Sequence, residues 1–343
     1  MGGAVLLAQV QQAAENLSIF NPASPPANSI RDLAVVVLAI TGGIFLIVEV
    51  VLIYSIIKFR RRPAANANEP PQIYGSHPIE VAWTAAPALI CFVLMLVVAR
   101  TEWEVRPRTP PPKEGDNALH VTVVGRQWWW EYRYEWWNGR KLNVITANEL
   151  HIPSCDPDAE GVQRPIYLKL LSADVCHSYW VPRLAGKTDL IPGKTNTMWF
   201  QTAEQGLFLG QCAEFCGTQH AKMLLRVYVD APADFEKWLA NEEKDARTPT
   251  DETLKRGEAA FMSQSCVNCH RIGGTPAKGT YAPDLTHLMS RQTLASGIVP
   301  NTKEFLRQWV VDPQKLKPRC LMPAFGLSDG DVDAIVAYLR SLE

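Results

Sequence analysis

The sequence predicts a multidomain membrane protein that combines a two-helix transmembrane hairpin, a β-sandwich or barrel and a small all-α domain. Three observations predict this fold: two long apolar segments near the start, evenly spaced β-forming runs in the middle, and helical patterns after residue 250. The chain has 343 residues, and at about 100–200 residues per domain it holds more than one. Apolar residues make up 47% of it and charged residues 20%, which excludes a largely disordered chain. The formal net charge of -1 argues against a nucleic-acid binder.

Two apolar segments predict the hairpin. Residues 33–57 carry a single charge, Glu49, and as a helix they would span roughly 37 Å, enough to cross a bilayer core. Residues 81–99 carry no charge. A helix pair buried in a soluble core is the alternative, and the flanking charges favour the membrane. Because four basic residues lie at positions 58–62, we expect the loop over 58–80 in the cytoplasm and both chain ends outside it.

Composition sets the boundaries around the hairpin. Residues 1–30 hold a short apolar run without a basic start, so we expect a flexible or processed N-terminal tail. The hairpin then occupies residues 31–100. Prolines are frequent over residues 101–118, which predicts a semi-rigid spacer. Residues 231–250 are rich in charge and predict a helical linker between the two domains that follow the spacer.

Residues 119–230 predict the β-domain. Short runs rich in Val, Ile, Thr, Trp and Tyr recur between turn signals such as Asn138-Gly139. Evenly spaced strands of this kind are typical of a β-sandwich or barrel. The clearest runs are residues 119–124, 142–146, 166–171, 197–201 and 223–229.

Residues 251–343 predict the all-α domain. Thr250 is the expected N-cap of its first helix. Two more helices fit residues 302–311 and 328–342, and the last one opens on Ser328 in a pattern like a capping box.

The strongest local motif is Cys266-Val-Asn-Cys269-His270. Two thiols on one helical turn can add to the two vinyl groups of a haem, and the adjacent histidine can ligate its iron. Met322 is the expected ligand on the opposite side, because a thioether there raises the reduction potential of a haem. The alternatives are a redox cysteine pair, which favours a βαβ context, and half of a zinc site, which needs a second ligand pair.

A second group of ligand-type residues lies on one short loop. Cys212, Cys216, His220 and Met223 are soft ligands that suit copper. A blue-copper site with one metal uses a single cysteine, so two thiolates favour two bridged coppers, each of which needs its own histidine. His177, on an earlier strand or turn, is the expected second histidine. The alternatives are a disulfide between the two cysteines and a zinc site of two cysteines and two histidines.

Together these motifs resemble subunit II of haem–copper cytochrome c oxidases, in the caa3 type that carries a fused C-terminal cytochrome c domain. The resemblance implies a cupredoxin-like fold for residues 119–230 and a class I cytochrome c fold for residues 251–343. It implies two cofactors, the dinuclear copper centre CuA and a covalent haem c. The residues that the resemblance assigns to CuA are His177, Cys212, Glu214, Cys216, His220 and Met223, and those that it assigns to haem c are Cys266, Cys269, His270 and Met322.

Three other residues receive roles from the resemblance. Glu214 matches the residue whose backbone carbonyl completes the second copper and whose carboxylate reaches a Mg²⁺ site shared with subunit I. Trp128 matches a surface tryptophan over CuA through which electrons enter, and its alternative role is packing of a strand. Glu80 matches a glutamate at the cytoplasmic mouth of the K-channel for protons, and its alternative role is to mark a helix N-terminus.

Two features outside these motifs carry weaker expectations. Lys315, Lys317 and Arg319 precede the expected methionine ligand. Such a charge run is usually a solvated face, and as a docking site it could face the CuA domain or an external donor. A disulfide between Cys155 and Cys320 would tie the two domains together.

The resemblance implies an enzyme subunit that passes electrons from an external donor, through haem c and CuA, to a haem in subunit I. There oxygen is reduced to water and protons are translocated across the bacterial plasma membrane, with the CuA and cytochrome c domains on the extracytoplasmic side. The implied partners are oxidase subunit I, other oxidase subunits, the lipid bilayer, and cytochrome c or another periplasmic donor. The alternatives are a subunit of a CuA-bearing nitric-oxide reductase and a membrane-anchored electron carrier, while a quinol oxidase subunit would lack the copper ligands.

Overall fold

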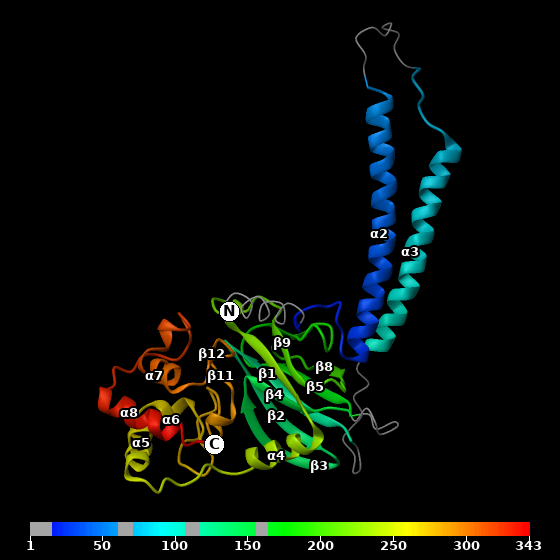
Figure 1. The fold of residues 1–343 in the computed structure, drawn as a ribbon. Helices are drawn as coiled ribbons and strands as arrows, with labels where there is room; N and C mark the ends of the chain where they lie inside the picture. Colours follow the sequence, from blue (N-terminus) through cyan, green and yellow to red (C-terminus); the bar gives the residue numbers. More distant parts are fainter. Residues whose placement is uncertain (1–15, 61–70, 107–116, 156–163) are drawn as a thin grey trace, which may run out of the picture. The chain divides into compact units, whose positions relative to one another are not determined.

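The computed structural model describes residues 16–60, 71–106, 117–155 and 164–343. The chain divides into two compact units (Figure 1). One unit holds residues 28–106, and the other holds residues 1–27 together with residues 107–343. The predicted architecture is confirmed: two long apolar helices are followed by a β-domain of two sheets and by a helical C-terminal domain, which we call the cytochrome c domain after the resemblance.

The two apolar helices are α2, Pro25–Lys58, and α3, His77–Val105. Their most apolar windows have mean hydropathies of 2.8 and 2.4, and both helices are long enough to cross a membrane. Each helix exceeds the predicted apolar span, because its backbone hydrogen bonding continues into polar residues at both ends. Of the predicted cytoplasmic loop, residues 61–70 lie outside the described part of the chain, including two of its four basic residues.

The segment before α2 differs from the expected N-terminal tail. The Asn16 side-chain amide donates to the Leu207 carbonyl oxygen at 2.7 Å, and its oxygen accepts from the Leu209 backbone N–H at 2.8 Å. The Arg183 guanidinium donates to the carbonyl oxygen of Asn21 at 2.7 Å. Residues 16–24 therefore hold specific bonds to the β-domain, and residues 1–15 lie outside the described residues.

The β-domain consists of two five-stranded sheets with the orders β3-β2-β1-β5-β8 and β4-β10-β9-β6-β7. Strand β1 pairs in parallel with β5, and β4 pairs in parallel with β10. Along β10 buried and half-buried residues alternate, so each sheet buries one face against the other. The strands are β1 (Leu119–Arg126), β2 (Trp129–Trp137), β3 (Arg140–Ala147), β4 (Glu149–Pro153), β5 (Ile166–Ser172), β6 (His177–Trp180), β7 (Thr188–Leu190), β8 (Asn196–Phe200), β9 (Gly206–Cys212) and β10 (Leu224–Asp230).

Large aromatic side chains fill the space between the sheets. Trp130, Tyr132, Tyr134 and Tyr179 are all fully buried there. Helix α4, Pro232–Glu242, closes one end of this core, because its Phe235 packs edge-on against a buried tryptophan of β2. The region expected as a linker thus contributes apolar side chains to the β-domain.

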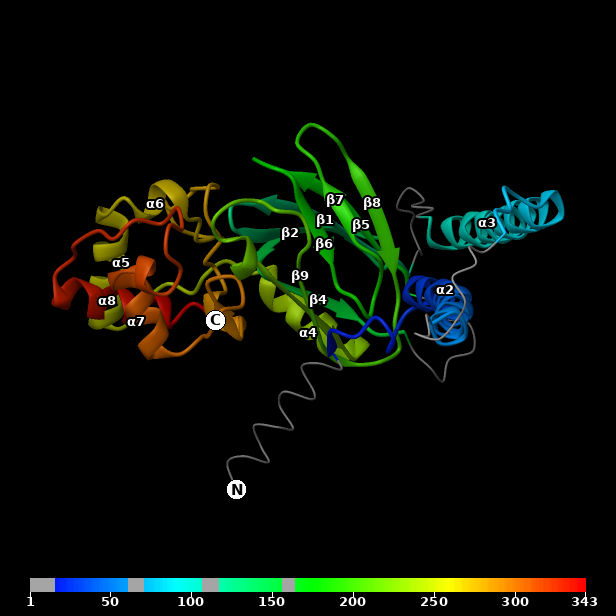
Figure 2. The same cartoon turned by 90° about the horizontal axis from the view of Figure 1, so that it is seen from above.

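The cytochrome c domain contains α5 (Glu252–Ser263), α6 (Cys266–Cys269), α7 (Lys303–Val311) and α8 (Asp329–Leu339). Figure 2 shows α5, α7 and α8 grouped around one another. Helix α5 crosses α8 closely at Gly257, where an added Cβ would lie 2.1 Å from the Ala334 carbonyl oxygen. Between α6 and α7 the chain also forms a two-stranded hairpin, β11 (Thr293–Leu294) and β12 (Val299–Pro300), so the domain is not strictly all-α.

The helix caps agree with the sequence patterns at two of three starts. Ser328 caps α8 and Thr302 caps α7, each through a side-chain oxygen that accepts a backbone N–H. The predicted cap Thr250 is wrong by one residue, because the carboxylate of Asp251 accepts from the first backbone N–H groups of α5.

Candidate functional site

The copper-type residues meet at one end of the β-sandwich because strands β9 and β10 are antiparallel neighbours. Cys212 ends β9 and Met223 directly precedes β10, and the Cys212 backbone N–H donates to the Met223 carbonyl oxygen at 3.0 Å. The loop between them therefore returns on itself and carries Cys216 and His220. His177 joins them from the start of β6, which pairs with β9. Residues 35 positions apart in the sequence thus become neighbours at one site.

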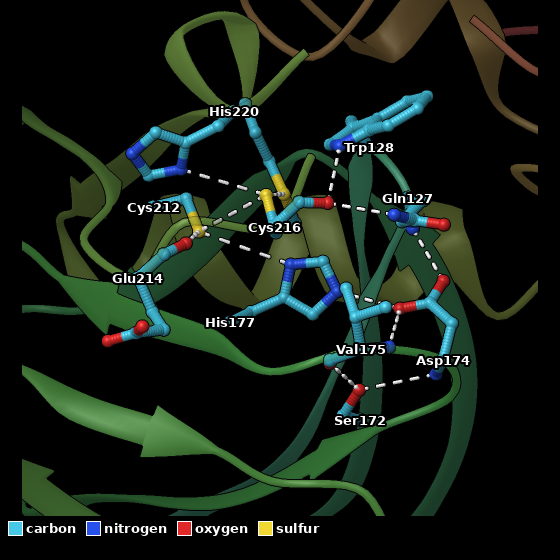
Figure 3. Close-up of polar contacts among 11 residues, drawn as sticks. Gln127, Trp128, Ser172, Asp174, Val175, His177, Cys212, Glu214, Cys216 and His220 are labelled. Carbon is cyan, nitrogen blue, oxygen red and sulfur yellow. Dashed lines mark hydrogen bonds and ion pairs between the residues drawn. The ribbon is translucent and has the colours of Figure 1, made fainter. Parts of the chain in front are cut away.

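Four side-chain distances define this site, and Figure 3 marks contacts among its residues with dashed lines. The two thiols lie at its centre, and each has its own histidine. The distances are 3.8 Å from Cys212 Sγ to Cys216 Sγ, 4.0 Å from Cys212 Sγ to His177 Nδ1, 3.7 Å from Cys216 Sγ to His220 Nδ1 and 3.9 Å from Cys216 Sγ to Met223 Sδ.

These distances fit a metal pair held by bridging thiolates. Metal–sulfur bonds of about 2.3 Å at a tetrahedral centre place two sulfur atoms about 3.8 Å apart. A disulfide requires about 2.05 Å between the sulfur atoms, and both cysteines are free thiols here. Cys212, Cys216 and His177 are buried, and they form the group of potential metal ligands found among the described residues. Each thiol has one histidine beside it, His177 beside Cys212 and His220 beside Cys216.

Glu214 presents its backbone to the site and its side chain to solvent. Its carbonyl oxygen lies 3.2 Å from Cys212 Sγ, and its side chain is exposed. Next to it, Phe215 is 76% exposed and contacts the ring of His220 edge-on. The carbonyl is therefore placed to serve as a further ligand, as the resemblance implied.

The thiol protons are shared between the two cysteines. A hydrogen bond from the Cys216 thiol lowers the pKa of Cys212 to about 3, and the same interaction raises the pKa of Cys216. The contact between the two sulfur atoms therefore favours one thiolate beside one thiol. A cation in the site favours loss of the second proton, because a thiolate is the form that binds metal.

Asp174 orients the His177 ring from the side opposite to the thiols. Its Oδ1 lies 2.8 Å from His177 Nε2, which leaves Nδ1 directed at the Cys212 sulfur. Burial alone would lower the pKa of His177, but the hydrogen bond to the Asp174 carboxylate leaves it raised. Burial likewise opposes ionisation of Asp174, and the bonds from His177 and from the backbone N–H groups of Val175 and Gln127 leave its pKa lowered. The sequence offered one signal for this residue, its position three before His177.

The segment before β2 contacts the copper loop directly. The Trp128 indole N–H and the Gln127 side-chain amide donate to the Cys216 carbonyl oxygen at 3.0 Å and 2.8 Å. Trp128 is only 9% exposed. The expectation of a surface tryptophan is therefore corrected: the cytochrome c domain covers it, and Lys317 of that domain donates to the Trp128 carbonyl oxygen.

The haem-type residues line one cavity of the cytochrome c domain. Cys266, Cys269 and His270 face it from α6 and its end, and Met322 faces it from the loop before α8. The rest of the cavity is largely apolar, with Leu285, Leu306, Trp309 and Leu339 among its lining residues. Gln127 and Trp128 of the β-domain also line this cavity.

Hydrogen bonds prepare both expected haem ligands. His270 Nδ1 lies 2.8 Å from the Pro283 carbonyl oxygen, so this nitrogen carries the proton and Nε2 remains free for a metal. Burial lowers the pKa of His270, which favours the neutral imidazole that ligation requires. The Gln314 amide donates to the Met322 carbonyl oxygen at 2.9 Å and so fixes the loop that carries the thioether. An apolar cavity with two thiols, an imidazole and a thioether fits a covalently attached haem.

The remaining predicted residues lie away from these two centres. Glu80 is in the first turn of α3, where the helix dipole favours a carboxylate. Glu49 lies in the middle of α2. Cys155 and Cys320 are free thiols, so the disulfide between them is not formed. Lys317 is 3% exposed, so it does not lie on a solvated face, and its bonds to the β-domain agree with the alternative that this charge run faces the copper domain.

Family models match three parts of the chain. Residues 119–229 match the periplasmic domain of cytochrome c oxidase subunit II. Residues 13–99 match the transmembrane domain of the same subunit, and residues 254–343 match cytochrome c. A cytochrome c oxidase subunit 2 of Alkalihalophilus pseudofirmus is 32% identical over 96% of this chain and 92% of its own length. A quinol oxidase subunit 2 of Bacillus spizizenii is 29% identical over 69% of this chain and 70% of its own length. The crystal structure of the periplasmic domain of cytochrome oxidase subunit II (CoxB) of Bradyrhizobium japonicum is similar with 28% identity and a TM-score of 0.32, over 38% of this chain and 96% of that one.

Proposed function

This chain belongs to the cytochrome c oxidase subunit II family, and from that premise we propose how its two centres are arranged for electron transfer. The family makes it a membrane protein with two spans, an oxidoreductase component of a haem–copper oxidase that works with other oxidase subunits, and the subunit through which electrons enter. Its copper domain implies CuA and its cytochrome c domain implies haem c.

We assign each cofactor to residues on the distances and linings described above. The copper ligands are His177, Cys212, Cys216, His220, Met223 and the Glu214 carbonyl, and the haem residues are Cys266, Cys269, His270 and Met322. When bound, both groups carry single electrons. The chain's own contribution is to exclude water from the copper ligands and to orient two imidazoles by hydrogen bonds.

Trp128 carries the functional proposal because it belongs to both centres. It lines the haem cavity, and its indole N–H donates to the carbonyl of the bridging ligand Cys216. We propose that Trp128 is the bridge for electrons between haem c and CuA within this chain. An external donor, cytochrome c or another periplasmic carrier, then reduces the haem and has no need of the tryptophan surface.

Further assignments concern the membrane and subunit I. Lys58 ends α2 and Arg60 follows it, so we place the loop after this helix in the cytoplasm and the two redox domains on the extracytoplasmic side of the bacterial plasma membrane. The exposed side chain of Glu214 is free to reach a Mg²⁺ ion shared with subunit I. Glu80 at the start of α3 is our candidate for the mouth of the proton K-channel. Oxygen reduction and proton translocation then take place in subunit I.

The complete copper ligand set favours an oxidase fed by a cytochrome over a quinol oxidase, although a quinol oxidase subunit is among the relatives. The test is low-temperature EPR of the purified complex, together with oxygen consumption on reduced cytochrome c, on quinol and in the presence of nitric oxide. We expect the hyperfine pattern of one electron shared by two equivalent coppers, and oxygen consumption with reduced cytochrome c. A signal from a single ordinary copper, or turnover on quinol alone, would contradict the proposal.

The role of Trp128 has its own test. We expect Trp128→Phe to keep the copper EPR signal, because the ring still fills the space, and to slow oxidation of haem c by copper, because the bond to the Cys216 carbonyl is lost. Trp136→Phe is the matched control, since this half-buried tryptophan of β2 is not among the residues that line the haem cavity. Equal rates in the two variants would show that Trp128 is not the bridge.

A further inference from the structure

The β11–β12 hairpin of the cytochrome c domain rests on the β-domain through hydrogen bonds to charged side chains. The buried Glu149 carboxylate of β4 accepts from the Gln292 backbone N–H at 2.9 Å and from the Thr293 hydroxyl. Arg226 of β10 donates to the Gly297 carbonyl oxygen at 3.1 Å. The two domains are thus joined by a specific interface that orders the hairpin.

Lys317 is the most buried cation of this interface, at 3% exposure. Its Nζ donates to three backbone carbonyl oxygens, those of Trp128 at 2.7 Å, Lys222 at 2.9 Å and Ala295 at 3.2 Å. An ammonium group has three N–H donors, so all three are satisfied. Among the described residues no carboxylate forms an ion pair with it.

Such an arrangement is costly to maintain. Burial removes the water that hydrates an ammonium group, and here only the dipoles of backbone carbonyls replace it, because no carboxylate in the described part of the chain is paired with it. Burial lowers the pKa of Lys317 to about 7, which reflects this cost. The lysine therefore calls for an explanation beyond the stability of the fold.

The three carbonyls come from segments that hold the two redox centres. Trp128 bonds to the Cys216 carbonyl, and Lys222 directly precedes the copper-site residue Met223. Lys317 itself lies five residues before Met322, and it lines the haem cavity. One ammonium group therefore joins the loop that carries Met322 to two parts of the β-domain, the segment of Trp128 and the copper loop that ends at Met223.

Two neighbouring bonds reinforce the same junction. The Lys222 ammonium donates to the Leu316 carbonyl oxygen at 3.2 Å, and the Gln219 amide donates to the Pro318 carbonyl oxygen. The carbonyls next to Lys317, those of Leu316 and Pro318, thus accept hydrogen bonds from residues close to the proposed copper ligand His220. These bonds fix the loop before Met322 in position against the loop that carries His220.

We propose that Lys317 is a positioning residue that fixes the haem cavity against the copper-ligand loops and thereby sets the rate of electron transfer between the two centres. This inference rests on the proposed function, in which haem c reduces CuA within this chain. Lys317 acts through Trp128 and through the two loops, and it contacts neither metal. Loss of its three bonds leaves the cytochrome c domain free to shift on the β-domain, and displacements of about 1 Å are enough to cost an aligned reaction a large factor in rate.

The experiment uses the purified holo-complex and Lys317→Met, which keeps the length of the side chain and removes its charge and donors. A flash-activated ruthenium bipyridyl complex reduces haem c, and its reoxidation is followed by haem absorbance together with the near-infrared absorbance of copper. We expect the transfer to slow about tenfold or more, with the copper EPR signal and the haem–methionine absorption band unchanged. Lys315→Met is the matched control, because this exposed lysine lies two residues away, and it should transfer at the wild-type rate.

The outcomes separate this inference from the proposed function. No transfer between haem and copper in the wild-type complex would refute the proposed function itself. Wild-type transfer together with an unchanged rate in Lys317→Met would overturn the inference. If Lys317→Met fails to bind copper or haem, Lys317→Gln decides, because its amide has two N–H donors and so removes at least one of the three bonds while it leaves a polar group at the junction. A wild-type rate in that variant then overturns the inference, and a slower rate supports it.

Discussion

The two redox domains solve the same problem, the placement of metal ligands, in opposite ways. In the β-domain, the copper-type side chains already contact one another and are oriented by protein hydrogen bonds such as that from the His177 imidazole to the Asp174 carboxylate. In the cytochrome c domain, Cys266 and Met322 face each other across an apolar cavity. The first domain has a core of its own, filled by aromatic residues. The second is arranged around space for its prosthetic group.

This difference has a simple physical origin. Two copper ions displace almost no volume, so a loop between paired strands can bring their ligands together without altering the core. A haem is larger than any side chain and must occupy part of the core itself. We therefore expect the β-domain to fold without its metal and the cytochrome c domain to depend on its cofactor.

The largest effect should follow from removal of both attachment thiols, Cys266→Ala with Cys269→Ala. Without covalent haem, the apolar lining that includes Leu285 and Leu306 loses its partner, and we expect about 5 kcal/mol or more of unfolding free energy to be lost, the whole stability of a small domain. Limited proteolysis should then cleave residues 251–343 while residues 119–230 stay protected. Protection of residues 251–343 in this variant would contradict the expectation that the cytochrome c domain depends on its cofactor.

Removal of one copper ligand, Cys216→Ser, should affect chemistry more than fold. A serine hydroxyl does not bridge two coppers, so the EPR pattern of a shared electron should disappear. The β-domain should lose only about 1–2 kcal/mol of unfolding free energy, because its aromatic core is untouched. Denaturant unfolding monitored by tryptophan fluorescence measures this change. Global unfolding of the domain would show that its site is not preformed.

A weaker effect should follow from Asp174→Asn, which keeps the shape of the side chain and removes the charge that orients His177. Hydrogen-bond partners of metal ligands typically change metal affinity by about 10–100-fold, and we expect a loss in this range. Copper titration against a competing chelator measures it. Asp189→Asn on β7 is the matched control and should leave copper affinity unchanged.

The smallest effect should come from a helix cap remote from both centres. Ser328→Ala removes the hydroxyl that accepts the Asp331 backbone N–H at 3.2 Å, and such losses cost about 1 kcal/mol. Thermal unfolding of the cytochrome c domain should shift accordingly, with the copper EPR signal unchanged. A change in the copper signal would mean that the two domains are coupled far more tightly than their separate cores suggest.

Much of this protein is determined locally and was therefore predictable. The apolar segments, the Cys266-to-His270 motif and the copper loop that ends at Met223 each contain their chemistry within a few turns of chain. The longer strands also follow from local pattern, whereas the short strands β6 and β7 do not, because three or four residues carry too little periodicity.

The remaining features depend on what packs against a residue from elsewhere in the chain. Lys317 stands in a run of basic residues that reads as a solvated face, and only the approach of the Trp128 and Lys222 carbonyls buries it. Trp128 reads as a surface residue until the cytochrome c domain covers it, and Asn16 reads as part of a tail until it bonds to β9. Sequence by itself determined which ligands and which elements this protein has, because those depend on residue type and near neighbours. Tertiary structure alone decided which charges and rings are buried between the two centres, because burial is a property of contacts that distant segments make.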